Sequence, residues 1–410
     1  MRIALLILSG MMLSYCTTAT SQPGHPLVND LWVAETDQAR RAIGNQLIDA
    51  APDTETLYRW LKQGPAYPAA ETGVIELRRI APDDTVYPYM VVVPEHYDPA
   101  RPWPVEFMLH GGVGREGWEP GGGWWRGGFD EFLEMDQITV IPASWMEHFW
   151  WQDNQAENLP AILYTLKQQY NIDDNRVYLT GISDGGTGTY FYAFKQPEHW
   201  ASYQPYIGNP GVLTNPDAGG GHRLYFENLL GAAFYIVNGE NDRLYPAAQL
   251  EPFIRQLSSA GVNHVWRVIE NGGHNTRWLP AEMPAIAQFK TENARDPFPE
   301  KITWVTDTTE RYNKNRWLRI DQLEREDIPG LVDIERSGNH FEVRTSRVSA
   351  FTILLNPEEI DFSEPVTVSL NGEPYFEEAL EQRGDVMMYS LLEGFDRELM
   401  VSAFINVTVE

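Results

Sequence analysis

Apolar residues recur at helical spacing near the start of the chain and then give way to short β-forming runs. Residues 36–51 and 53–62 have the helical period, so we expect residues 22–72 to form a small N-terminal helical segment. From residue 73 onward, apolar runs rich in β-branched and aromatic side chains predict strands.

Strand-like and helix-like patterns alternate between residues 73 and 295. Apolar runs predict the strands, and segments of helical period between them predict the helices. The expected strands are 74–77, 89–93, 105–109, 138–143, 177–182, 233–237 and 265–269, and the expected helices are 156–170, 247–259 and 281–291. Such alternation favours the α/β class, with a doubly wound, mostly parallel sheet and helices on both faces.

The helical period fades after residues 294–299, a charged and proline-containing stretch that we expect to be a linker. Short β-forming runs follow, and Gly338-Asn339 and Asn371-Gly372 between them are typical of hairpin turns. Residues 300–410 are therefore expected to form a C-terminal all-β, sandwich-like domain.

The first residues have the pattern of a targeting segment. An apolar run at residues 3–13 is too short to span a bilayer permanently, and residues 1–21 are expected to be a signal segment. The run leads to Cys16, the one cysteine of the chain, and resembles a bacterial lipoprotein signal. Because Tyr15 departs from the small residue usual there, cleavage by an ordinary signal peptidase near residues 17–19 is the alternative. Both predict export, as a periplasmic or outer-membrane-anchored lipoprotein or as a secreted protein, with membrane attachment only through an N-terminal lipid.

Charge and composition argue against several kinds of function. The 410 residues carry a net charge of −27, which disfavours nucleic acid and anionic membrane surfaces as partners. The nine histidines include no H-E-x-x-H pattern, so we expect no metal site. No phosphate-binding or dinucleotide-binding fingerprint stands out, so we expect no cofactor.

A candidate nucleophile lies in Gly181-Ile182-Ser183-Asp184-Gly185, between an expected strand and an expected helix. In that context G-x-S-x-G forms the nucleophile elbow, which holds a serine hydroxyl out of the chain. The flanking glycines are needed because the tight turn tolerates no Cβ. Ser183 is therefore the candidate nucleophile, and a glycine-rich structural turn is the alternative.

A serine hydroxyl needs a base, and the base needs an orienting acid. In a doubly wound hydrolase the acid and then the histidine follow the serine, each in a loop after a strand. Asp242 follows one expected strand and His274 follows the next. We therefore expect Ser183, Asp242 and His274 to form a catalytic triad, with Glu240 as the alternative acid.

The oxyanion of a tetrahedral intermediate needs backbone N–H donors. The N–H of Asp184, directly after the nucleophile, is one candidate. His110-Gly111-Gly112 follows the expected strand 105–109, and its glycines would let the backbone approach the substrate closely. Gly112, or else Gly111, is the candidate for the second donor.

These motifs together resemble a known superfamily. Residues 73–291, with the H-G-G loop, the G-I-S-D-G-G elbow, the N-D acid and the G-G-H base, are similar to α/β-hydrolases of the serine esterase and peptidase type. Within it they resemble polyhydroxybutyrate-depolymerase-like and feruloyl-esterase-like enzymes, and also prolyl-oligopeptidase-like catalytic domains. The propeller of prolyl oligopeptidases is not expected, since only about fifty residues lie between the signal segment and the first hydrolase strand.

Aromatic residues gather in two loops that we expect at the same sheet edge as Ser183. Packing of loop against helix would explain them, and so would an aromatic wall for an apolar, aromatic or sugar-bearing substrate. The candidate substrate-binding residues are Trp118, Trp124, Trp125, Trp145, Trp150 and Trp151.

The leading interpretation is an exported serine hydrolase that cleaves a small or polymeric carboxylic ester through an acyl-enzyme. The rival enzyme is a serine peptidase of the prolyl-oligopeptidase-like type. The rival outside the enzymes is a surface binding protein on a hydrolase scaffold.

Overall fold

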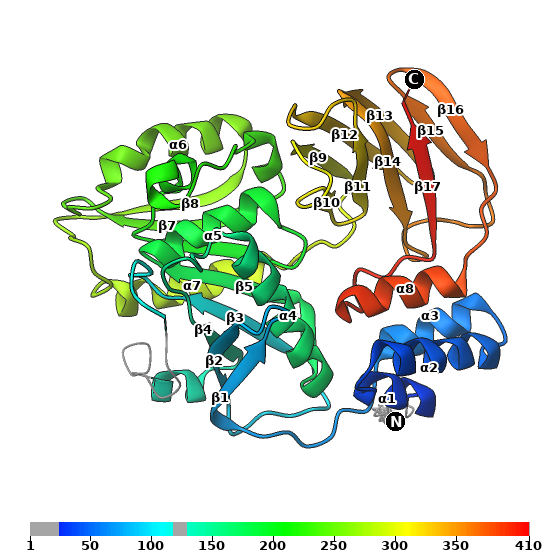
Figure 1. Ribbon diagram of the computed structural model, residues 1–410, viewed down its shortest axis with the longest axis horizontal. Helices are drawn as coiled ribbons and strands as arrows, with labels where there is room; N and C mark the ends of the chain where they lie inside the picture. The colour runs from blue at the N-terminus through cyan, green and yellow to red at the C-terminus, as the bar shows by residue number, and fades with distance from the viewer. Residues whose placement is uncertain (1–23, 118–128, 410) are drawn as a thin grey trace, which may run out of the picture.

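The computed structural model describes residues 24–117 and 129–409, and an eight-stranded sheet forms its centre (Figure 1). The strand order is β1-β2-β4-β3-β5-β6-β7-β8. β2 pairs antiparallel with β1 and with β4, and all the other neighbours are parallel. The expected mostly parallel sheet is confirmed. Its strands are β1 Gly73–Ile80, β2 Val86–Val93, β3 Trp103–Leu109, β4 Ile138–Pro142, β5 Ile172–Ile182, β6 Ser202–Tyr206, β7 Ala233–Gly239 and β8 Asn263–Ile269.

One strand of this sheet, β6, was not predicted. Its sequence, Ser-Tyr-Gln-Pro-Tyr, lacks a run of aliphatic residues, yet all five residues are buried because β6 lies between β5 and β7. A central position in a parallel sheet buries both faces of a strand, and here tyrosine rings supply much of the apolar surface.

Helices cover both faces of the sheet (Figure 1). Because side chains alternate along a strand, Phe234 and Ile236 of β7 pack in the core shared with α4, α5 and α6, whereas Tyr235 and Val237 pack with α7 on the other face. These helices are α4 Asp153–Gln169, α5 Asp184–Lys195, α6 Ala247–Ala260 and α7 Leu279–Glu292. Short 3-10 helices lie in the connections, at η1 Phe129–Glu134, η2 Pro210–Thr214, η3 Pro216–Ala218 and η4 Phe226–Leu229.

The C-terminal part contains two further sheets, with strand orders β10-β11-β14-β17 and β16-β15-β13-β12-β9. Their facing side chains form one buried cluster that includes Trp304, Trp317 and Phe351. Both expected hairpin turns are present, since Gly338 and Asn371-Gly372 adopt positive φ between paired strands. The strands are β9 Lys301–Thr306, β10 Lys314–Asn315, β11 Leu318–Leu323, β12 Gly330–Ser337, β13 His340–Ser346, β14 Val348–Leu355, β15 Val366–Leu370, β16 Glu373–Glu378 and β17 Ala403–Thr408.

Helices from the two ends of the chain share a separate core. α1 Pro26–Val33, α2 Asp37–Ala50 and α3 Thr54–Gln63 pack with α8 Gly384–Gly394. Leu31 and Leu61 meet Met387 and Leu391 of α8 in this cluster, and all four are fully buried. α2 and α3 match the expected helical pattern, whereas α8 lies where only strands were expected. The N-cap position holds Arg383, which is not a preferred capping residue and makes no capping hydrogen bond.

A buried ion network joins the C-terminal part to the central sheet layer. Arg295 donates two hydrogen bonds to Asp396, at 2.7 and 2.9 Å. Lys167 on α4 pairs with Asp174 at 2.7 Å and lies 3.5 Å from Asp396. Burial alone would raise the pKa of Asp396, but Arg295 and Lys167 outweigh it and hold that pKa well below its usual range.

No helix in residues 24–117 or 129–409 is long and apolar enough to cross a membrane. The predicted signal segment, with Cys16, lies outside the described residues.

Candidate active site

Ser183 lies on a sharp turn between β5 and α5. Its backbone has φ 58° and ψ −118°, a conformation that L-residues rarely adopt and that persists only where the surroundings enforce it. A Cβ on Gly181 would lie 2.0 Å from the carbonyl oxygen of Gly185, and a Cβ on Gly185 would lie 2.0 Å from that of Leu109. The two glycines are therefore required by the turn, as the sequence pattern predicted.

The loops after β7 and β8 bring two more predicted residues to Ser183. His274 Nε2 lies 2.8 Å from Ser183 Oγ, and His274 Nδ1 lies 2.8 Å from Asp242 Oδ2. The other oxygen of Asp242 accepts hydrogen bonds from the backbone N–H groups of Leu244 and Tyr245, at 2.8 and 3.0 Å. The Asp242 side chain is 0% exposed, so the carboxylate is fixed and shielded from water.

Glu240, the alternative acid, makes a different contact. Its Oε2 accepts a hydrogen bond from the backbone N–H of Asn271 at 2.8 Å. That bond joins the loop after β7 to the loop after β8. Within this geometry Asp242 is the partner of His274, and Glu240 supports the loops.

The His110-Gly111-Gly112 loop passes directly over Ser183. A Cβ on Gly111 would lie 2.7 Å from Ser183 Cβ, and Gly112 has φ +71°, so glycine is required at both positions. Ser144 donates its backbone N–H to His110 Nε2 at 3.0 Å. Burial lowers the pKa of His110 to about 4, so the ring is neutral at pH 7 and anchors the loop without adding charge.

The N–H of Gly112 is engaged, which the sequence did not predict. Gly112 and Val113 both donate to Asp184 Oδ2, at 2.9 and 3.0 Å. A carboxylate oxygen of Asp184 thus accepts both backbone N–H groups that this loop offers next to Ser183. The N–H of Asp184 itself is the first of α5 and has no acceptor within the helix, so it remains available near Ser183.

Two of the predicted substrate-binding tryptophans are corrected to structural roles. Trp150 is fully buried, donates its Nε1–H to the carbonyl of His110 at 2.8 Å, and packs edge-on against the His110 ring. Trp151 is 2% exposed and donates to the carbonyl of Gly219 at 3.1 Å. Both side chains are buried and hold neighbouring loops in place through these hydrogen bonds.

Trp145 is half-buried beside the same loops. Its ring lies 4.4 Å from that of His148 and 5.4 Å from that of Tyr87. A ligand-binding role for Trp145 stays a prediction. Trp118, Trp124 and Trp125 lie outside the described residues.

Two residues near the site were not singled out from the sequence. The Tyr245 ring packs edge-on against His274 at 5.8 Å, and burial raises the pKa of Tyr245 to about 12. The Arg115 guanidinium lies beside Gly112, 3.6 Å from where a Cβ would stand. The sequence indicates these two residues only by their positions: Tyr245 is three residues after Asp242, and Arg115 is three residues after Gly112.

Among the residues that the structure describes, no cluster of three or more histidine, cysteine or carboxylate side chains is arranged to hold a metal ion.

Comparisons with known proteins give structural likeness only. No family model matches the sequence, and no curated protein does. A thermostable esterase aligns over 54% of this chain and 63% of its own length, with 20% identity and a TM-score of 0.44. A ferulic acid esterase aligns over 53% of this chain and 98% of its own, with 18% identity and a TM-score of 0.41. A putative dipeptidyl aminopeptidase IV from Bacteroides ovatus aligns over 56% of this chain and 36% of its own, with 17% identity and a TM-score of 0.41.

The architecture of the chain itself identifies the fold. A mostly parallel eight-stranded sheet in the order 1-2-4-3-5-6-7-8 carries helices on both faces. A serine at a strained strand-to-helix turn, and an acid and a histidine after later strands, occupy the positions of a nucleophile elbow and its partners. The central part of this protein has the α/β-hydrolase fold.

Proposed function

We propose that this protein is a serine hydrolase that cleaves carboxylic esters through a covalent acyl-enzyme. The observation that carries the proposal is the continuous path Ser183–His274–Asp242, with both distances 2.8 Å. Two independent features support it, namely the strained φ of Ser183 and the full burial of the Asp242 carboxylate. Strain and burial of this kind are retained at reactive sites.

In the proposed reaction, Ser183 Oγ attacks the ester carbonyl carbon while His274 Nε2 takes the hydroxyl proton. Asp242 holds the Nδ1–H and stabilises the imidazolium that forms. His274 then gives the proton to the departing alcohol oxygen, which leaves the acyl group on Ser183. Water, activated by the same histidine, attacks the acyl carbon and releases the carboxylic acid.

The oxyanion of each tetrahedral intermediate requires donors near Ser183 Oγ. The N–H of Asp184 supplies one. The N–H of Gly112 supplies the second only after Asp184 Oδ2 leaves it, since the two are hydrogen-bonded at 2.9 Å. We therefore propose that rotation of the Asp184 side chain precedes the chemical step.

The test compares wild type with Ser183→Ala on a nitrophenyl ester. We expect kcat to fall by a factor on the order of 10⁴ or more, because no other group in this geometry can form the acyl-enzyme. Ser259→Ala, an exposed serine on α6, is the matched control and should keep full turnover. A fluorophosphonate probe should label wild type and not Ser183→Ala.

Undiminished turnover in Ser183→Ala would refute the assignment. Folded wild type that resists the probe would favour a binding protein on a hydrolase scaffold instead. Peptidyl amides assayed beside esters separate the peptidase alternative, which faster amide cleavage would support.

We also propose that residues 1–21 direct export and that Cys16 receives lipid, on the sequence pattern alone. Wild type expressed in bacteria with labelled fatty acid should retain label, and Cys16→Ser should not. Equal labelling of both would reject lipidation.

A further inference from the structure

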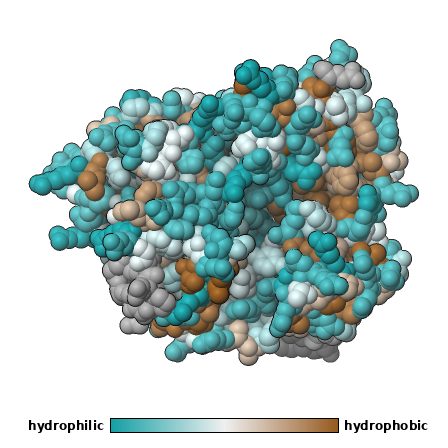
Figure 2. Space-filling model, viewed as in Figure 1, coloured by the Kyte–Doolittle hydropathy of each residue, from teal (hydrophilic) through white to brown (hydrophobic). Residues whose placement is uncertain are grey.

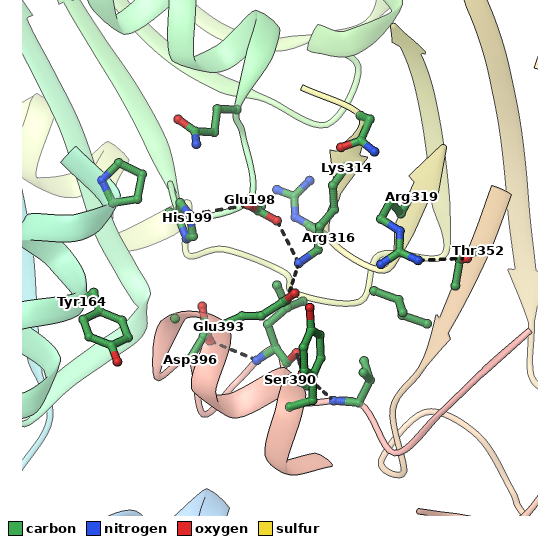
Figure 3. Close-up of a pocket in the computed structure, with 18 of the residues that line it drawn as sticks. Tyr164, Glu198, His199, Lys314, Arg316, Arg319, Thr352, Ser390, Glu393 and Asp396 are labelled. Atoms are coloured by element: carbon green, nitrogen blue, oxygen red, sulfur yellow. Dashed lines mark hydrogen bonds and ion pairs between the residues drawn. The ribbon is translucent and has the colours of Figure 1, made fainter. Parts of the chain in front are cut away.

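A large cavity separates the α/β layer from the C-terminal sheets, away from Ser183. Its volume is about 1240 Å³, above the roughly 300–1,000 Å³ common for small-ligand sites. Its walls come from α4 and residues 195–199 on one side, from the sheet containing β11, β14 and β17 on another, and from α8 at the base (Figure 3). The surface is hollowed between these parts (Figure 2).

Arg316 in the cavity wall is a buried cation that has no carboxylate within 4 Å among the described residues. It is 7% exposed, and its guanidinium makes one hydrogen bond among the described residues, from Nη1 to Asn315 Oδ1 at 3.3 Å. Its Nε is buried and has no hydrogen-bond partner within residues 24–117 and 129–409. Arg316 also has φ 52° at the first position of the two-residue β10–β11 turn, where glycine is usual. A buried, unpaired charge on a strained backbone costs stability, so a ligand is the natural reason to retain it.

The other cations that line the cavity are neutralised. Lys314 lies 3.2 Å from Glu393 and 3.5 Å from Glu198 (Figure 3). The remaining ones, in the described part of the chain, each have a carboxylate within 4 Å, as Lys167 with Asp174, Lys195 with Asp307, Arg311 with Glu157, Arg319 with Asp321 and Arg383 with Asp385. Arg316 is thus the one lining cation in these residues that is left for an external anion.

Unsatisfied polar atoms also line the cavity on the α/β side. Gln196 Oε1 and His199 Nδ1 are both buried in residues that line the cavity, and neither has a hydrogen-bond partner in the described part of the chain. Burial lowers the pKa of His199 to about 4, so its ring is neutral. Buried polar atoms are rarely left unpaired, and hydroxyl groups of a ligand would satisfy both an amide oxygen and an imidazole nitrogen.

The sheet wall adds a polar row and exposed rings. Arg319, Thr352 and Asn406 are neighbours across β11, β14 and β17, joined by hydrogen bonds of 3.4 and 3.0 Å. Phe404 of β17 and Tyr389 of α8 also line the cavity, and they are 38% and 65% exposed. Flat rings beside fixed donors and acceptors suit a ligand with apolar ring faces and many hydroxyls.

We propose that this cavity binds an acidic sugar chain, with Arg316 holding the carboxylate of one uronic acid unit. The guanidinium fork matches a carboxylate bidentately. Arg319 and Asn406, which Thr352 holds in place, receive the neighbouring sugar units together with the rings of Phe404 and Tyr389. The proposal does not rest on hydrolysis at Ser183.

The test measures binding to full-length Ser183→Ala protein by calorimetry, so turnover cannot affect the result. The probes at equal ionic strength are trigalacturonate, its fully methyl-esterified form, and acetate. Trigalacturonate should bind, and the methyl ester should bind at least about tenfold more weakly, because it lacks the charge that Arg316 contacts. Acetate should bind at least about tenfold more weakly as well.

Arg316→Gln in the same background should weaken trigalacturonate binding at least about tenfold without lowering the melting temperature, since it removes an unpaired buried charge. Arg255→Gln, an exposed arginine on α6, is the matched control and should bind like the parent. If Arg316→Gln does not fold, Phe404→Ala gives the second measurement and should weaken binding severalfold.

Equal binding of the acid and its methyl ester would overturn the role of Arg316. Acetate binding as tightly as trigalacturonate would overturn the sugar part of the proposal. Absence of trigalacturonate binding to folded protein would overturn both, and leave the hydrolase proposal standing on its own test.

Discussion

At the scale of single residues, Asp184 combines two opposed roles. Its backbone N–H stands at the helix start beside Ser183, while its carboxylate occupies the N–H groups of Gly112 and Val113. The sequence predicted the first role from the G-x-S-x-G spacing. It could not predict the second, because the contact joins two loops about seventy residues apart and depends on a side-chain rotamer.

We predict that Asp184→Asn raises kcat/KM toward a nitrophenyl ester about fivefold. The wild-type carboxylate holds the Gly112 N–H that the oxyanion needs, and a hydrogen bond to a charged acceptor is stronger than one to a neutral amide of equal size. Release of that N–H that is easier by about 1 kcal/mol corresponds to about fivefold in rate. Steady-state kinetics and circular dichroism test this. A loss of activity in a folded variant would mean that the carboxylate mainly orders the H-G-G loop.

At the scale of elements, prediction succeeded where a local pattern and its environment agreed. The buried strands and the elbow were recognisable because aliphatic runs and glycine spacing are local features of the sequence that determine the local structure. β6 and α8 were missed because tertiary contacts, which a local sequence pattern does not reveal, stabilise them. β6 is buried on both sides by its neighbours, and α8 is stabilised by side chains such as Leu31 from the other end of the chain. Trp150 and Trp151 were misassigned for the same reason, since burial is not visible in composition.

The packing of α8 makes a measurable prediction. Met387→Ala should lower the free energy of unfolding by about 2–5 kcal/mol, because Met387 is fully buried among the N-terminal helices and its truncation leaves a cavity. Tyr389→Ala, two residues away and 65% exposed, should change it by less than about 0.5 kcal/mol. Denaturant unfolding of both variants gives the comparison, and equal effects would contradict this account of α8.

At the scale of the whole molecule, buried ion pairs join the C-terminal part to the α/β layer. Arg295 is 0% exposed at its side chain and depends on Asp396. Removal of residues 300–410 would therefore leave Arg295 without its carboxylate partner and would also expose Lys167 to solvent. Point variants test this interface more cleanly than truncation.

Asp396→Asn should destabilise the protein at pH 7 by about 3–5 kcal/mol, because it leaves Arg295 buried without its acid. The folded pKa of Asp396 is depressed, so its contribution is present above the unfolded value near 4 and is lost as pH falls below that value. The difference in melting temperature between wild type and Asp396→Asn should therefore shrink below about pH 4. Asp385→Asn, an exposed aspartate paired with Arg383, is the control, and a difference that does not vary with pH would count against the network.

The shared core of α1, α2, α3 and α8 has a consequence for synthesis. Leu31 of α1 and Leu61 of α3 share this core with Met387 and Leu391 of α8, so part of the apolar surface of the N-terminal helices stays uncovered until residues 384–394 have been made. A chain that stops early would keep that surface exposed to chaperones and proteases. The helical core of α1, α2, α3 and α8 can therefore be completed only after the chain has been translated through α8. Prematurely terminated chains would expose this apolar surface and be degraded.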